Sequence, residues 1–495
     1  MAPGSMLLFG QWTVWITPIW LLAVGTTLGL LVLLLAYGLL WVFSRQAGVF
    51  VMTTVKEGIL LPISYLALFL AAVALVLWIG MPVRRMAESV GRVLAVGEIR
   101  RAVDVPARTT DHEVAIAFRT DELRSCKIAS QQDIVIATRP GESMNEGVVE
   151  VEGGEPLEWD HTSAREAPFK DWVDALYITN RSDAPSTVEL DLITGVEYPE
   201  VFCIPVTAGS LVGLFLVYIL VAVTMPKLSA IAVATAKEAA SQPIFYLTLG
   251  LGAFALILFI YVPYNTFGED VKVLKDSGLT LIMILSLIVA LWTASVSLAD
   301  EIEGRTALTV LSKPISRWKF ILGKFLGIIW PVVLMFVLLG FLFLVTVSYK
   351  VVYDAHETAG AEPTWQVCYA EMMGTAPGLV LALMETVVLA SISVAISTRL
   401  PMLSNLLICS TIYVLGHLVP LIVNSAASKF EIVGFVGQLT ATVLPVLEVF
   451  NIQAAIAGGR AVPLSYLVEA LAYCLLYSTV AMLLALAMFE DRDLA

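Results

Sequence analysis

A glutamate in the middle of an apolar stretch is the most unusual chemical group in this sequence. Glu385 lies within the run 376–397, which has the length and composition of a membrane-crossing helix. A carboxylate near the centre of a bilayer costs about 2.5–3.5 kcal/mol, so it is expected to face protein or water. The residues that share its helical face are small: Ala382, Thr386, Ala390 and Ser393. Glu385 is therefore a candidate for a role in translocation or at a helix interface. A protonated glutamate hydrogen-bonded to a neighbouring helix is the alternative.

The second candidate is a short polar stretch, 300–324, between two long apolar runs. Its five basic residues are Arg305, Lys313, Arg317, Lys319 and Lys324. Short connectors rich in Lys and Arg remain in the cytoplasm. Pro314 predicts that one helix ends at Lys313, and the Ser316 hydroxyl is expected to cap the next helix. The pattern predicts a helix–break–helix surface that faces a partner.

The sequence lacks the common motifs of nucleotide-binding and hydrolytic sites. It contains no GxxxxGK[ST] loop, HExxH pair or GxSxG elbow, so we expect no catalytic residues and no ATP hydrolysis by this chain. Its five cysteines are scattered without ligand spacing, so we expect no metal site and no disulfide framework. No cofactor is expected in this chain, and nothing suggests nucleic-acid binding.

The composition is that of a membrane protein with many spans. Hydrophobic residues make up 58% of the chain and charged residues 14%, which excludes an ordinary soluble enzyme. A hydrocarbon core about 30 Å thick needs about 20 apolar residues per helix. About nine stretches are candidates: 13–43, 59–81, 201–224, 243–264, 279–298, 320–347, 376–397, 403–423 and 464–488. The run 432–450 is diluted by polar residues and is interpreted as a re-entrant or interfacial helix, although a further span is not excluded.

The stretch 82–200 differs from the rest and predicts an inserted soluble domain. From Arg84 to Glu200 there are 13 basic and 23 acidic residues, so most of the net charge of −13 belongs to this insert. Alternating apolar and polar residues predict strands at 114–118, 134–136, 176–178 and 188–192. Turn-forming residues fill 180–186. We expect a β-sandwich-like domain of about Ig size, and its function is not evident from the sequence.

Two connectors, each followed by a span, are similar at a constant offset of 181. Eight residues between 54 and 68 recur: Thr54, Lys56, Glu57, Pro62, Ile63, Tyr65, Leu66 and Leu68. Either both connectors are the same device, a short helix at the cytoplasmic face before a span, or two segments of similar composition have converged by chance.

The distribution of basic residues predicts the orientation. Over the last six spans, nine basic residues fall on the proposed cytoplasmic side and five on the other. The third span then ends in the cytoplasm, which places the insert 82–200 outside. Arg84 and Arg85 argue weakly against this assignment.

The connector carries a recognisable motif. Glu303-Gly304-x-Thr306 is followed by Leu-Ser-Lys-Pro-Ile-Ser-Arg at 311–317 and by Leu-Gly-Lys at 322–324. This pattern resembles the cytoplasmic connector after the second span of ABC-2 type permeases, the membrane subunits of ATP-driven transporters. The resemblance covers about 226–495 and implies a six-span permease domain there. The two-span unit 1–81, the β domain 82–200 and the third span 201–225 depart from the plain family pattern.

The resemblance implies a permease subunit that forms a translocation pathway, with export as the expected direction. A separate cytoplasmic ATPase would bind ATP and Mg, and a second permease, identical or paralogous, would complete the pathway in a bacterial inner membrane. The residues expected to couple to the ATPase are Lys237, Glu238, Glu301, Glu303, Gly304, Thr306, Pro314, Arg317 and Lys324. The alternative is a non-transporting membrane anchor or assembly scaffold whose outer β domain binds a partner.

Overall fold

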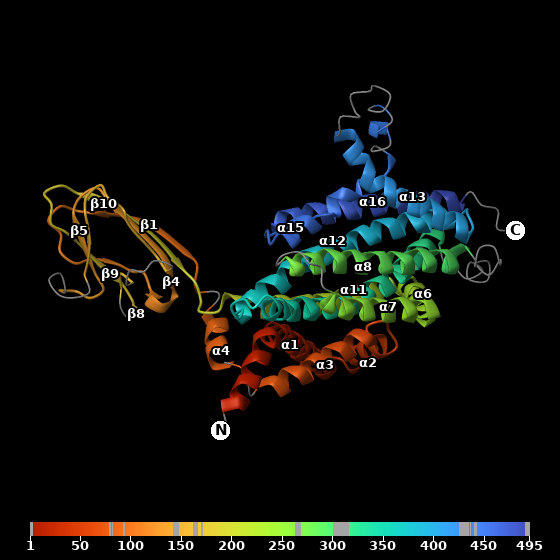
Figure 1. Ribbon diagram of the computed structural model, residues 1–495, viewed down its shortest axis with the longest axis horizontal. Coiled ribbons are helices and arrows are strands. Elements are labelled where there is room, and N and C mark those ends of the chain that lie inside the picture. Colours follow the sequence, from red (N-terminus) through yellow and green to blue (C-terminus); the bar gives the residue numbers. More distant parts are fainter. Residues whose placement is uncertain are drawn as a thin grey trace. The chain divides into compact units, whose positions relative to one another are not determined.

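The computed structural model describes residues 3–78, 81, 83–92, 95–141, 148–161, 167–169, 172–262, 269–299, 316–424, 435, 437–439 and 443–490. The chain forms two compact units. One combines Met1–Ile79 with Ile204–Ala495, and the other is Gly80–Cys203. The first unit is helical and the second is rich in β-strands (Figure 1).

Long helices make up the first unit. They are α1 (Pro3–Phe43), α2 (Arg45–Lys56), α3 (Leu61–Leu77), α5 (Cys203–Thr224), α6 (Pro226–Ser241), α7 (Pro243–Tyr261), α8 (Asp270–Ala294), α11 (Arg317–Glu357), α12 (Trp365–Ser397), α13 (Met402–Asn424), α15 (Gln453–Ala457) and α16 (Leu464–Glu490). The end of α8 continues as a single π-helical turn, Ser295–Ala299. π-Helical turns inside helices are rare and are frequently found at functional sites.

Seven of the described helices are long and apolar enough to cross a membrane, against about nine expected. They are α1, α5, α7, α8, α11, α12 and α16, and an eighth is reached if α2 and α3 are counted together across a bend of 92°. The remaining predicted span lies on α13, whose apolar part Met402–Leu418 is shorter. The expected class, a polytopic helical membrane protein, is confirmed.

Side-chain burial in the first unit follows the pattern of a membrane bundle. Its largest core cluster lies between α7, α8, α11 and α12 and includes Leu285, Leu339 and Phe343. Helices at the periphery instead expose large apolar side chains; Phe254 on α7 is 65% exposed and Leu476 on α16 is 69% exposed. Such exposure is unfavourable in water and is expected for helices that face lipid.

Both similar connectors consist of a short helix, a break and a longer helix with proline in its first turn. α2 ends before a break at 57–60 and Pro62 lies in the first turn of α3, while α6 ends at Ser241 and Pro243 begins α7. Burial also corresponds at the offset of 181. The buried residues of α6, namely Leu228, Ala232, Thr235, Ala236 and Ala239, match half-buried positions 47, 51, 54, 55 and 58.

The second unit contains one helix, α4 (Val83–Arg92), and an antiparallel β-sandwich among its described residues. One sheet has the order β1-β10-β4-β7 and the other β2-β9-β5-β6, with a separate β3-β8 pair. The strands are β1 (Glu98–Val105), β2 (His112–Val114), β3 (Phe118–Arg119), β4 (Leu123–Ser130), β5 (Ile134–Ala137), β6 (Val149–Val151), β7 (Leu157–Asp160), β8 (Trp172–Val173), β9 (Leu176–Asn180) and β10 (Ser186–Thr194). Both sheets contribute side chains to one core, for example Leu190 from β10 and Ile178 from β9.

Three of the four predicted strands correspond to β5, β9 and β10. The fourth, 114–118, is wrong as a single strand because the chain changes its pairing partner there. Val114 is the last residue paired with β9, and Phe118 begins a new pair with β8. The apolar alternation persists because Ile116 is buried between them, at 3% exposed. The predicted turn at 180–186 is confirmed, and the Asn180 side-chain amide donates to the Ala184 carbonyl across 2.9 Å.

The run 432–450 falls partly outside the described residues. Within it, Leu447–Phe450 is a 3₁₀ helix, with Leu447 and Phe450 buried.

Candidate coupling and translocation site

Most of the predicted coupling connector lies outside the described residues. Glu301, Glu303, Gly304, Thr306 and Pro314 all belong to that stretch. The structure describes its two borders, the π-helical turn Ser295–Ala299 and the start of α11. These borders and the helices that contact them form the described part of the site.

Ser316 begins α11 but does not cap it through its side chain. The residue occupies the N-cap position with extended backbone angles, φ −72° and ψ 145°. Its hydroxyl makes no capping hydrogen bond, so that prediction was wrong. The Ser316 carbonyl instead accepts from the amides of Lys319 and Phe320, at 3.0 and 3.2 Å.

The predicted coupling residues on α11 differ in exposure. Arg317 is exposed, and its Nη1 donates to the carbonyl of Glu490 at the end of α16 across 2.8 Å. Lys324 is buried at 4% exposed, and its Nζ lies 5.8 Å from the centre of the Phe320 ring. Arg317 is thus accessible to a partner, whereas Lys324 belongs to the packing inside the unit.

Helix α6 carries the other two predicted residues, Lys237 and Glu238, and both are exposed. The opposite face of α6 packs closely on the start of α11. A Cβ atom placed on Gly327 would lie 2.5 Å from Cβ of Thr235 and 2.8 Å from the carbonyl oxygen of Ala232. A side chain at this position has no room, so glycine allows α6 and the first turns of α11 to pack in close contact.

A buried polar cluster connects the π-helical turn with two other helices. It consists of Asn405 on α13, Ser295 in the π-helical turn, and Ser393 and Ser397 on α12, all without measurable exposure. The Asn405 amide nitrogen lies 2.8, 2.7 and 2.9 Å from the three serine hydroxyls. An amide carries two hydrogens, so it donates to two of the three serines at one time. We call these four residues the Asn405 cluster.

Sequence reasoning did not find the Asn405 cluster. The signal was present, because an asparagine within an apolar helix needs internal partners and Ser393 and Ser397 share a helical face. What the sequence lacks is the information that α8, α12 and α13 meet at this level.

The structure places Glu385 inside the bundle, as expected for an intramembrane carboxylate. The side chain is 2% exposed, and its Oε1 lies 3.4 Å from Nε2 of His417 on α13. Glu385 Oε1 makes no hydrogen bond to any described residue. The His417 Nδ1 lies 3.1 Å from the carbonyl of Tyr413, which orients the ring. The carboxyl of Glu385 and the imidazole of His417 thus bring two ionisable groups together between α12 and α13.

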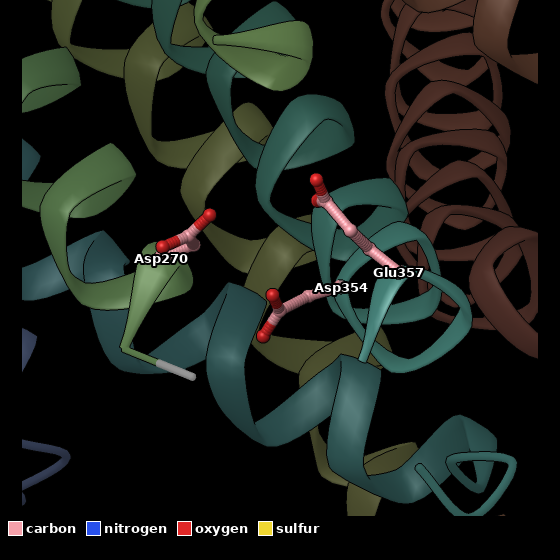
Figure 2. Close-up of side chains that lie close together, drawn as sticks. All are labelled: Asp270, Asp354 and Glu357. Atoms are coloured by element: carbon pink, nitrogen blue, oxygen red, sulfur yellow. The ribbon is translucent and has the colours of Figure 1, made fainter. Parts of the chain in front are cut away.

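Two buried lysines form ion pairs that join α8 to α11 and to α12. Figure 2 shows Asp270 on α8 beside Asp354 and Glu357 on the last turns of α11, and their carboxylate oxygens lie within 4.8 Å of one another. Lys350 is fully buried, with Nζ 3.5 Å from Asp270 and 3.1 Å from the carbonyl of Ile260. The ammonium group therefore supplies the positive charge that Asp270 needs, and the arrangement is an ion pair between α8 and α11. Lys275 on α8 pairs in the same way with Glu371 on α12.

Fold and site together define a polytopic membrane protein whose helices are joined by buried polar contacts and which carries a separate β unit. A family model described as ABC-2 family transporter protein matches residues 201–494, which is more than half of the chain. The chain therefore belongs to the ABC-2 transporter family. The match begins at the start of α5, whereas the motif resemblance placed the family part at 226–495. A comparison with curated proteins finds no matching relative.

Proposed function

We propose that this ABC-2 family chain is the permease subunit that forms a translocation pathway and is driven by a separate cytoplasmic ATPase, in the direction of export. The ATPase would bind ATP and Mg, and it would contact the exposed residues Lys237, Glu238 and Arg317 together with the connector 300–315. The observation that carries the coupling proposal is the close packing of α6 on α11 at Gly327. This contact packs together α6 and the start of α11, the two segments that border the proposed docking surface.

The described contacts give a physical route from that surface into the bundle. The connector follows the π-helical turn, whose irregular hydrogen bonding makes it a suitable place for α8 to bend. Through the Asn405 cluster, a shift of Ser295 reaches α12 and α13 directly. Glu385 lies twelve residues from Ser397 on α12, and His417 lies twelve residues from Asn405 on α13. At 1.5 Å per residue this is about 18 Å deeper.

We further propose a bacterial inner-membrane location with residues 82–200 on the extracytoplasmic side, and a second permease, identical or paralogous, as partner. Buried pairing supports the orientation. Two of the five lysines and arginines assigned to the outer side, Lys275 and Lys350, are buried and paired with carboxylates. They therefore do not act as free loop charges, and the excess of basic residues on the proposed cytoplasmic side increases.

The test is reconstitution with an ATPase. The full chain would be co-expressed with a P-loop ATPase without spans of its own, encoded beside it, and ATP hydrolysis measured in proteoliposomes. Lys237→Glu and Arg317→Glu are expected to reduce the stimulated hydrolysis at least about fivefold, because each reverses a charge that faces the partner. Lys227→Glu makes the same change at the first turn of α6 and serves as the matched control.

Equal expression and equal thermal stability of the variants are required for this interpretation. Unchanged stimulation in both Lys237→Glu and Arg317→Glu would exclude the proposed docking surface. If no ATPase binds the chain, the alternative of a membrane anchor or assembly scaffold is favoured instead.

A further inference from the structure

A groove of about 360 Å³ lies between the first turns of α11 and the last turns of α16. Its walls are formed by Leu322 and Phe325 on α11 and by Leu475, Met482 and Leu483 on α16, and eight of its ten lining residues are apolar. Leu475 and Leu483 are 59% and 62% exposed. An apolar groove on an outward face of a membrane bundle is open to lipid chains.

The groove can be placed at a depth in the bilayer. In α16, 20 uninterrupted uncharged residues separate Glu469 from Glu490, which is about the length of a hydrocarbon crossing. Phe489, at the end of this run, stacks on Phe320 with the ring centres 5.7 Å apart. Phe320 therefore marks the boundary of the hydrocarbon on α11. The groove begins there and continues into the hydrocarbon, and Trp318 lies at the level of the headgroups.

Two basic residues are the sequence neighbours of Trp318, which lines the groove. Arg317 and Lys319 flank Trp318, and Lys319 Nζ lies 5.3 Å from the centre of the Trp318 ring. Arg317 uses one Nη1 for the carbonyl of Glu490. Within the part of the chain that the structure describes, no carboxylate lies within ion-pair distance of either side chain. Two cations and an indole ring lie at the headgroup level, next to an apolar groove. This arrangement is complementary in charge and polarity to an amphiphile with an acidic head group.

We propose that this groove binds an anionic phospholipid of the bilayer. One acyl chain lies along Leu322, Phe325 and Leu483, and the phosphate lies between Arg317 and Lys319. Trp318 is then next to the ester groups, where tryptophan is favoured because its ring is apolar and its N–H is polar. A zwitterionic lipid fits less well, because its own ammonium or choline group competes for the phosphate. Arg317 also borders the proposed ATPase-docking surface, so the test below uses Lys319 and the groove-lining residues instead; lipid binding itself does not depend on the proposed transport function.

The test is native mass spectrometry of the delipidated full chain with added phosphatidylglycerol or phosphatidylcholine. The wild type is expected to retain one phosphatidylglycerol more tightly than phosphatidylcholine. Lys319→Gln is expected to weaken the phosphatidylglycerol complex about fivefold, because one lysine near an anionic surface contributes that much. Leu483→Trp fills the groove and is expected to abolish the tight complex. Leu484→Trp places the same ring on the next residue, which is 54% exposed and does not line the groove, and it is expected to have no effect.

Leu475→Trp, with Leu476→Trp as its control, repeats the comparison in case Leu483→Trp does not fold. The proposal fails if the wild type retains both lipids equally, or if the groove-filling variants bind phosphatidylglycerol as their controls do. It also fails if filling the groove changes the oligomeric mass and leaves the lipid count unchanged. In that case the groove is a contact between copies of the chain.

Discussion

At the residue scale, the pairing of Glu385 with His417 determines what substitutions there should do. Glutamine keeps the size of Glu385 but removes its ionisable carboxyl, so the packing of α12 on α13 remains. We expect Glu385→Gln to lower transport about tenfold, which corresponds to about 1.4 kcal/mol, without reducing assembly. Substrate flux in proteoliposomes and yield after size-exclusion chromatography measure the two effects.

Glu385→Ala serves as the comparison, because it also removes the side-chain volume and is expected to impair assembly. Wild-type transport by Glu385→Gln would remove this residue from the candidate site. A loss of assembly in Glu385→Gln would assign it a purely structural role.

The Asn405 cluster leads to a second prediction at this scale. Leucine in place of Asn405 has a similar volume but no hydrogen-bonding groups. The Ser295 hydroxyl retains its own bond to the Leu291 carbonyl at 2.9 Å, which limits the loss. We expect Asn405→Leu to destabilise the bundle by about 1–2 kcal/mol, from buried hydrogen bonds that each contribute about 0.6 kcal/mol or more in membranes.

Unfolding by titration with a denaturing detergent measures the change for Asn405→Leu. Ser410→Leu, at an exposed position of the same helix, is the control and is expected to be neutral. Equal stability of the two variants would show that the cluster contributes nothing to the bundle.

At the scale of elements, the contact between α6 and α11 can be tested with one methyl group. Gly327→Ala would bring its Cβ into the space of Thr235 and Ala232, and overpacking of this kind costs about 1–3 kcal/mol. Gly250→Ala in α7 meets no atom within 4 Å and removes only the unfavourable helix propensity of glycine. We therefore expect opposite signs for the same substitution, measured as the midpoint of thermal unfolding in detergent. Destabilisation of both variants to the same extent would contradict the close contact.

The ion pair between Asp270 on α8 and Lys350 on α11 leads to a further prediction about stability. Lys350→Met leaves the carboxylate of Asp270, which is 7% exposed, without its ammonium partner. Loss of one member of a buried pair costs about 3–5 kcal/mol. Adding Asp270→Asn removes the uncompensated charge, so the double variant is expected to recover most of the loss. A double-mutant cycle measures this coupling, and additive effects would show that the two residues do not interact.

At the scale of the whole molecule, the sequence predicted the kinds of elements well and their contacts poorly. Long apolar runs identified the spans because the bilayer sets their length. The short helix expected before the second span corresponds to α2, but its angle of 92° to α3 could not be read from hydropathy, which does not report direction. Glu385 was found because a charge in an apolar run is visible in one dimension. The Asn405 cluster and the Lys350 pair were missed because their members are distant in sequence, for example Ser295 and Asn405, 110 residues apart.

The orientation of the whole chain is open to a direct test. Glu189→Cys places a thiol on an exposed position of β10, and Lys237→Cys places one on the exposed face of α6. A membrane-impermeant maleimide applied to intact cells is expected to label the first and not the second.

The native background is low, because all five cysteines are buried. In the β unit, burial raises the pKa of Cys126 to about 12, so its thiol is protonated at neutral pH. The pKa of Cys126 is higher in the folded protein than its ordinary value of 9.0. The protonated thiol therefore stabilises the fold below pH 9, and this stabilisation is lost as the pH rises toward 12. Cys126 therefore adds little background to the labelling at pH 7. Reaction of Lys237→Cys alone would invert the proposed orientation and remove α6 from the reach of a cytoplasmic ATPase.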